Sequence, residues 1–440
     1  ALSLLGTVKI FGIMQQAINL GAVVAWFSIA TIFPLIMISL GTGRWVRRLK
    51  VATMPELFGK MYGQKIRLFV CAVIALQTFV LTIETQGLGT VFNALSAGKV
   101  SVAMGAIIGG IIGIFYVIIA GMKEVGMVNV VNVIVMYVGL IAAAIILGHV
   151  LPGNGWSDFE AYFMSSGQEH MLNFFGAPGV FFSFALNNIL ALLCAQSVSQ
   201  MGVQSAIAAR SEKDIKRAVL VSAPVNGIFG LITMTMGLAG KYMVETGNLS
   251  LPEGVKATGQ AIGTQVIIQM MPGWVVCLLL AAFLGAILST FAITTMALGS
   301  IFLNNIYILK HRDASEKQKT MVVRIMIVIT GVVAMAIASK LPNIINSANW
   351  SFAWITPLFF TLVFGLFWKQ SRVGAAATMG VSWIVILLYT FTPLPSVLGI
   401  TLPLIYIVLI VCIVVGVISY AVTKGERGYM ILWKEEHGIR

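Results

Sequence analysis

The sequence has few charged residues and no polar stretch long enough to form a water-soluble domain. Of its 440 residues only 10% are charged, whereas 59% are hydrophobic, and the mean hydropathy is +0.97. A soluble fold cannot hide so large an apolar fraction, because the buried share of the surface levels off as chains grow. The composition therefore excludes a soluble globular protein and indicates one that crosses a membrane several times.

Cysteine and histidine are also scarce, with 4 residues of each type. Cys71, Cys194, Cys277 and Cys412 are scattered through apolar stretches, too far apart in sequence for a disulfide framework or a metal site. We expect all four in the core. The histidines show no ligand spacing, and a nucleotide loop, a nucleophile elbow and a zinc-protease motif are all missing. The sequence thus predicts neither an enzyme nor a bound cofactor.

Apolar runs of about 20 residues, enough to cross about 30 Å of hydrocarbon, recur along the whole chain. We predict an all-α polytopic membrane protein with about twelve transmembrane segments. The expected segments are 1–19, 20–42, 66–93, 101–121, 126–151, 176–205, 216–243, 274–309, 319–340, 347–368, 372–391 and 399–423. The first begins apolar at once, without an initiator Met, and we expect the sequence to start inside a helix.

The net charge of +13 has a pattern that favours a membrane over nucleic acid. Nearly all of the 28 Lys and Arg residues lie in alternate loops and in the C-terminal tail. The exceptions are Lys9, Lys99, Lys241, Lys256 and Lys340. By the positive-inside rule, the basic loops and the C-terminus are cytoplasmic in a multi-pass protein of the plasma (inner) membrane. We expect the lipid bilayer, and no nucleic acid, as a partner; the oligomeric state is left open.

One stretch of the eighth segment combines small and hydroxyl residues. In a helix Ala286, Ser289 and Thr290 stand at i, i+3 and i+4, so they share one face that offers a carbonyl and two neutral hydroxyls. Hard, uncharged oxygen ligands of this kind suit a monovalent cation such as Na⁺. The alternative is that both hydroxyls simply bond back to a carbonyl of the preceding turn.

Two segments resemble interrupted helices. They are Ser3–Thr7 in the first segment and Cys194–Gly202 in the sixth, which open successive groups of five segments. Transporters with inverted repeats bind substrate and ions at such breaks, where unwound carbonyls and helix ends face a protected cavity. The alternative is that the small residues only let helices pack closely.

Several motifs in order resemble the sodium:solute symporter family over nearly the whole chain. They are Arg47–Phe58 followed by Tyr62-Gly63, Tyr116 with Ala120–Lys123, Ser199–Arg210, and Phe367–Lys369 followed by Gly374-Ala375. The resemblance implies a LeuT-type fold of two inverted five-helix repeats that transports a small solute with sodium. The implied divisions are 1–151 for the first repeat, 152–175 for an outer loop, 176–368 for the second repeat, and 369–440 for two accessory helices and a tail.

The resemblance also implies a sodium site. In this family, hydroxyls of the eighth core helix and carbonyls from the break in the first helix hold the ion. Carried over, the ligands are the carbonyls of Leu2, Leu5 and Ala286 and the hydroxyls of Ser289 and Thr290.

The chain departs from the family where some members bind a second sodium. Ala292 and Ile293 replace polar residues, and the fifth helix reads Val128-Asn129 with Asn132, where a T-D-x-x-Q pattern is common. The resemblance therefore predicts one sodium per transport cycle. Ser205 replaces the usual Arg of the sixth-segment motif, which puts any contact of that Arg in doubt.

The candidate substrate residues begin with two charges inside the bilayer, Lys9 and Glu84. Intramembrane charges are costly and face a partner or a functional cavity. Lys9 and Glu84 can pair with each other, or Lys9 can anchor a substrate carboxylate while Glu84 meets an ammonium group or supplies the counter-charge. The further candidates are Ser28, Thr31, Gln86, Asn188, Gln196, Ser199 and Gln200.

These residues favour a small carboxylate or zwitterion over a sugar as the solute. Lys9 stands where sugar-transporting relatives carry an uncharged polar side chain, and only hydroxyls (Ser28 and Thr31) stand at their polar second-helix positions. Three alternatives stay open: a sodium-independent exchanger, proton coupling through Glu84, and a transporter-like sensor.

Overall fold

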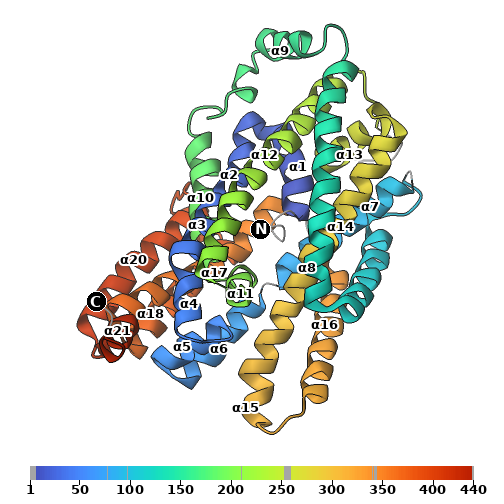
Figure 1. Cartoon of the computed structure of the whole chain (residues 1–440). Helices are drawn as coiled ribbons and strands as arrows, with labels where there is room; N and C mark the ends of the chain where they lie inside the picture. Colours follow the sequence, from blue (N-terminus) through green and yellow to red (C-terminus); the bar gives the residue numbers. More distant parts are fainter. Residues whose placement is uncertain are drawn as a thin grey trace.

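The computed structural model is a bundle of long helices (Figure 1). It describes residues 6–76, 78–96, 98–209, 211–251, 259–338, 340 and 344–438. In these ranges, 11 helical stretches are long and apolar enough to cross a membrane. One of them, Val8–Arg48, has 41 residues, which would extend about 60 Å, twice the thickness of the hydrocarbon. It therefore makes two crossings, in agreement with the predicted segments 1–19 and 20–42.

The turn between those two crossings is at Gly21. Its φ is +76°, and a Cβ at this position would overlap the backbone of Met171, so only glycine fits. The first crossing consists of η2 (Val8–Gly12) and α1 (Ile13–Leu20). The second consists of η3 (Gly21–Ala25), α2 (Trp26–Ala30), α3 (Ile32–Leu40) and α4 (Thr42–Arg48).

The next segments follow the apolar pattern with one difference. They are α5 (Met54–Tyr62), α6 (Gln64–Ala75), α7 (Thr78–Leu95) and α8 (Val102–Val150). We expected separate helices at 101–121 and 126–151, but α8 is helical over all of its 49 residues. No proline interrupts this stretch, so the helical backbone continues from one apolar run into the next.

The regions expected as outer loops contain helices that the sequence analysis missed. The chain continues through α9 (Trp156–Ser165), η4 (Glu169–Met171), η5 (Phe181–Leu186), α10 (Asn187–Val198), α11 (Gln200–Ala208), α12 (Glu212–Glu245) and α13 (Gly259–Met270). Of these, α9 falls within the expected loop 152–175, and α13 lies between the expected segments 216–243 and 274–309. Neither is long enough to span a membrane.

The second half ends with the accessory helices. It contains α14 (Gly273–Phe302), η6 (Leu303–Tyr307), α15 (Ile308–Lys310), α16 (Glu316–Ala338), α17 (Ile344–Phe367), α18 (Arg372–Phe391), α19 (Leu394–Val397), α20 (Leu404–Val422) and α21 (Tyr429–Glu436). Strands β1 (Lys369–Gln370) and β2 (Glu426–Arg427) pair antiparallel and tie the C-terminal tail to the start of α18. Helix α14 packs against α7, α8 and α16 in the interior.

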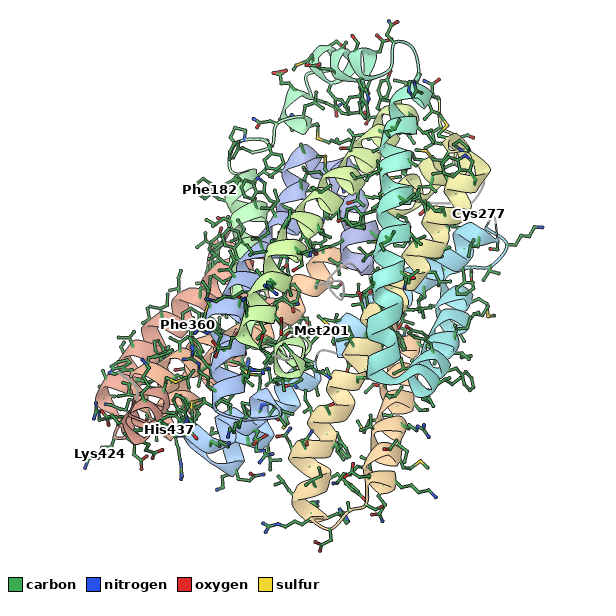
Figure 2. All side chains as sticks on the ribbon, viewed as in Figure 1. Phe182, Met201, Cys277, Phe360, Lys424 and His437 are labelled. Carbon is green, nitrogen blue, oxygen red and sulfur yellow. The ribbon has the colours of Figure 1, made fainter. Side chains whose placement is uncertain are left out.

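One expected core residue is not in the core. Cys71, Cys194 and Cys412 are buried as predicted, whereas Cys277 is exposed. It lies near the start of α14, at the edge of the bundle (Figure 2). An exposed apolar side chain is ordinary for a protein whose sides face lipid, so an apolar sequence context does not predict burial here.

The two ends of the bundle differ in charge. At one end, which we call the basic end, α5, α6 and α15 lie together (Figure 1). There Arg44 and Arg48 of α4 both pair with Glu212, each through Nε at 2.9 Å. At the opposite end α9 is tied to α12, because the Tyr162 hydroxyl donates to Glu245 at 2.7 Å. That hydrogen bond, with burial and the carboxylate's charge, raises the pKa of Tyr162 to about 12.

Candidate functional site

The sixth segment is broken where the sequence predicted. Helix α10 ends at Val198, Ser199 is extended with φ −65° and ψ 141°, and α11 begins at Gln200. The Ser199 hydroxyl accepts the Gly202 N–H at 3.0 Å, which caps the second half of the helix. The break expected at residues 3–7 lies largely outside the described residues. Its end is described: Gly6 O accepts the N–H groups of Lys9 and Ile10, so helical bonding begins there.

The hydroxyl face of α14 has the predicted geometry. Ser289 Oγ and Thr290 Oγ1 lie 2.8 Å and 3.2 Å from the Ala286 carbonyl oxygen, and all three residues are buried. Three uncharged oxygens thus meet at one place on the helix, a donor set that suits Na⁺. The same contacts arise from back-bonding in apolar helices. The remaining predicted ligands, Leu2 and Leu5, lie outside the described residues, so the five-ligand site stays a prediction.

A small cavity connects this helix with the first one. Its volume is about 50 Å³, and most of its lining is apolar, including Phe27 and Phe352. The polar residues that line it are Lys9, Thr31, Glu84, Gln196 and Thr290. They come from five different elements, so the fold brings one hydroxyl of the predicted sodium site and four predicted substrate residues to a single place.

Lys9 is buried in this cavity wall and bonds to neutral groups. Its Nζ lies 2.9 Å from Thr31 Oγ1 and 2.5 Å from Asn226 Oδ1, and its side chain is 2% exposed. In the described part of the chain no ion pair joins Lys9 to Glu84. The pairing that the sequence left open is therefore not the observed arrangement, although Glu84 lines the same cavity.

Both acceptors of Lys9 are fixed by their own donors. The Thr31 hydroxyl donates to Ser28 O at 2.6 Å, and the Asn226 amide nitrogen donates to Ser222 O at 2.7 Å. Their oxygens are thereby turned toward Lys9. An ammonium has three N–H donors, and two are used in these bonds. Within the part of the chain that the structure describes, the third donor can serve a group in the cavity that Lys9 lines.

Glu84 lines the cavity and also contacts the start of the first helix. Its Oε2 accepts the Thr7 N–H at 2.9 Å, at the start of the first helix. A Cβ at Gly6 would overlap the Glu84 carboxylate, and a Cβ at Gly87 would overlap Thr7 Oγ1, so glycines permit this close approach of α7. A carboxylate at a helix N-terminus is favoured by the free N–H groups and the helix dipole. Glu84 therefore fixes the end of the helix break.

The other predicted substrate residues lie outside the lining of this cavity. Asn188 donates to Phe184 O within its helix, and Ser28 packs against Gly230 of α12. Ser199 serves as the cap of α11. Gln200 faces the inner loop, where its amide oxygen accepts the Met54 N–H at 3.0 Å. Gln86 is partly buried on α7.

A larger cavity of about 240 Å³ lies between α3, α11 and α12, toward the basic end. Gln196 and Met201 line both cavities, so these two side chains stand between them. Met201 is on α11 near the middle of the molecule (Figure 2). Its sulfur accepts the Thr294 hydroxyl at 3.4 Å, one turn from Thr290 on α14.

Two of these residues, Asn226 and Met201, were missed by the sequence analysis. Asn226 is an uncharged polar residue in an apolar helix, close to Pro224 and Gly227, and an amide inside a membrane helix is a signal that could have been used. Met201 gives no such signal, because a methionine in an apolar segment is ordinary.

A protein with these features is a helical membrane transporter: a cavity in mid-bundle, a broken helix and a buried charge that faces it. A sequence profile of the sodium:solute symporter family matches residues 1–382. The chain belongs to this family, and this membership connects it with sodium-coupled transport. No curated protein sequence matches the chain significantly.

Solved structures agree on the fold. A Na⁺-coupled sialic acid symporter, in a substrate-bound outward-open state, has a TM-score of 0.77 and 17% identity, with 97% of this chain and 89% of that chain covered. MhsT in complex with L-phenylalanine has a TM-score of 0.56 and 15% identity, with 93% and 96% covered. The architecture is that of LeuT-type transporters.

Proposed function

We propose that this protein takes up a small organic carboxylate together with one Na⁺ by alternating access. The observation that carries the carboxylate is Lys9. A buried ammonium is expensive unless it is paired, and its two partners here are neutral. A bound carboxylate would supply the missing charge through the third N–H donor, in a charge-assisted hydrogen bond.

The rest of the cavity favours a solute with an apolar body. Val8, Phe27, Ile83, Leu192 and Phe352 are among the apolar residues that line it with Lys9. A sugar needs hydrogen-bonding partners for many hydroxyls, and buried groups without them cost affinity. A zwitterion is the second candidate, because Glu84 also lines the cavity and a carboxylate can accept further bonds besides that of Thr7.

One sodium is proposed because the positions where some relatives bind a second one lack side-chain oxygens, whereas one set of neutral oxygens is present on α14. Ala286, Ser289 and Thr290 supply three of the five proposed ligands, and the carbonyls of Leu2 and Leu5 complete the set. One turn further along the helix, Ala292 and Ile293 offer no side-chain oxygen. Asn132 of α8 lies against Gly285. It stands in the stretch where some relatives carry a T-D-x-x-Q pattern, and its side chain is an uncharged amide.

The proposed cycle uses both cavities. Na⁺ would join α14 to the broken first helix and so shape the cavity next to Thr290 for the solute. Release would follow through the larger cavity, past Gln196 and Met201, toward the basic end, which we take to be cytoplasmic. A ligand shifts such an equilibrium only by its different affinity for the two states, so sodium must bind the outward-facing state more tightly.

Thermal stability of the purified protein tests this function. A ligand that binds only the folded state raises the melting temperature by mass action. We expect a set of small carboxylic acids to raise it in NaCl, and to raise it less in KCl. Each acid is compared with its own primary amide, which has nearly the same shape but no charge, and the amides should have no effect.

Two results would contradict the proposal in different ways. Equal stabilisation by an acid and its amide would remove the role of Lys9 while leaving sodium coupling intact. Equal stabilisation in NaCl and KCl would point instead to a sodium-independent exchanger. Stabilisation by hexoses, with no effect of the acids, would indicate that the substrate is a sugar.

A further inference from the structure

An apolar groove lies on the side of the bundle, away from the transport cavities. It has a volume of about 200 Å³ and is formed by α6, α14 with η6, and α16. Leu298, Ile301 and Ile306 form its floor, whereas the exposed Ala72 and Ala75 leave room on the α6 side. Among the described residues that line it, Thr330 is polar, and its hydroxyl donates to Met326 O within its own helix.

Three lysines lie beyond one end of this groove, each on the face of its helix that lines it. Lys65 precedes Leu68 by three residues, Lys310 follows Ile306 by four, and Lys319 precedes Met326 by seven. These spacings put each lysine on the same helix face as its groove residue. All three are displaced toward the basic end, because α6 and α16 start there and η6 and α15 finish there.

The neighbouring charges leave this place positive. Lys319 pairs with Glu316 at 2.7 Å, and that carboxylate is 89% exposed to its surroundings. Arg67 turns inward instead, with Nε 2.7 Å from Asn305 Oδ1 and Nη2 2.9 Å from Asn304 O. Lys65 and Lys310 are exposed, so their ammonium groups can reach a ligand at the groove's end.

We propose that an anionic phospholipid occupies this groove, with one acyl chain against its apolar floor and its phosphate among Lys65, Lys310 and Lys319. Both halves of the site point to the same ligand. Basic clusters at the end of apolar grooves between membrane helices attract anionic headgroups, and an acyl chain fills apolar space that water would wet at a cost. A neutral lipid would leave the lysines unused, and free phosphate would leave the groove unfilled.

Native mass spectrometry of the delipidated full chain tests the proposal, with phosphatidylglycerol and phosphatidylcholine of identical acyl chains as probes. We expect a preference for phosphatidylglycerol. The triple variant Lys65→Gln, Lys310→Gln, Lys319→Gln should lose about tenfold in its affinity for that lipid. A matched triple variant of exposed lysines elsewhere at the basic end, Lys213→Gln, Lys216→Gln, Lys424→Gln, should keep the preference.

A second variant tests whether the acyl chain of the lipid lies in the groove. Ala72→Phe fills the groove without changing charge, and it should weaken binding of both lipids. The proposal is overturned if the first triple variant binds phosphatidylglycerol as the wild type does. It is equally overturned if glycerol phosphate, which has the headgroup chemistry but no chain, competes as well as the whole lipid. Sodium-dependent melting, measured on the same samples, reports that each variant is folded.

Discussion

The cavity is bordered by two regions that handle charge in opposite ways. On α14, Ala286, Ser289 and Thr290 present neutral oxygens that bond among themselves. On the first helix, the Lys9 amine is held by the neutral acceptors of Thr31 and Asn226. We propose that the first arrangement binds a cation and the second an anion.

The two regions also differ in how far apart their hydrogen-bond partners lie in the chain. Ser289 and Thr290 both donate to a carbonyl of their own helix. A buried ammonium cannot be satisfied within one helix. Lys9 therefore depends on Thr31 and on Asn226 of α12, which is 217 residues away in the chain. We expect substitutions on α14 to change the sodium dependence of transport alone. We expect substitutions around Lys9 to change the affinity for the solute.

The largest expected effect comes from removing both hydroxyls of α14. The double variant Ser289→Ala, Thr290→Ala loses two of the proposed sodium ligands. Hydrogen bonds and ligand contacts to a charged group contribute about 1.5 kcal/mol or more each, so sodium affinity should fall about 100-fold. Uptake into proteoliposomes, measured over a range of sodium concentrations, gives the half-saturating concentration directly.

A matched control for this variant lies further along the same helix. Thr295 is buried and bonds back to Phe291 O at 2.9 Å, but it does not line the cavity. Thr295→Ala should leave the sodium dependence unchanged. If the double variant still shows wild-type sodium dependence, the oxygens of α14 are packing groups and the sodium site is elsewhere.

A smaller but more selective effect is expected at Lys9. Lys9→Gln keeps a long polar side chain but removes the charge and the charge-assisted bond to a carboxylate. That loss, about 2 kcal/mol, corresponds to a rise of about 30-fold in the half-saturating concentration of the solute. The melting shift that sodium alone produces should be retained. Loss of both responses in a folded protein would mean that Lys9 supports the structure of the break and does not bind the solute.

How far the sequence predicts this site depends on how local each feature is. The face shared by Ala286, Ser289 and Thr290 follows from helix periodicity, and the break at Ser199 follows from polar and small residues within a few positions. Both were predicted. The membrane crossings follow from apolar length alone, whereas the inverted-repeat architecture was implied by the resemblance to the family.

The remaining features depend on distant contacts. A Lys9–Glu84 pair was one of the alternatives left open, and the contact of the Glu84 carboxylate with Thr7 N–H was not foreseen, because it depends on Gly6 and Gly87 letting α7 approach the helix end. The role of Asn226 needs the packing of α12 against the first helix, which apolar periodicity does not specify. Helices α9 and α13 lie in segments too short and too polar for a membrane pattern to detect.

The smallest expected effect is at Asn226. The order of activity of two variants there tells whether Asn226 positions Lys9 or only packs in the helix. Asn226→Ala removes one neutral acceptor of Lys9, about 1 kcal/mol, so the half-saturating concentration of the solute should rise about fivefold. Asn226→Asp keeps the shape of the side chain but adds a carboxylate beside the ammonium, which would compete with the solute for Lys9. We therefore expect Asn226→Asp to transport carboxylates less well than Asn226→Ala, by about a further twofold to threefold.

A purely structural role requires the reverse order, because the variant closer in shape would then be the better transporter. Initial uptake rates at fixed sodium, with the sodium half-saturation unchanged in both variants, decide between the two.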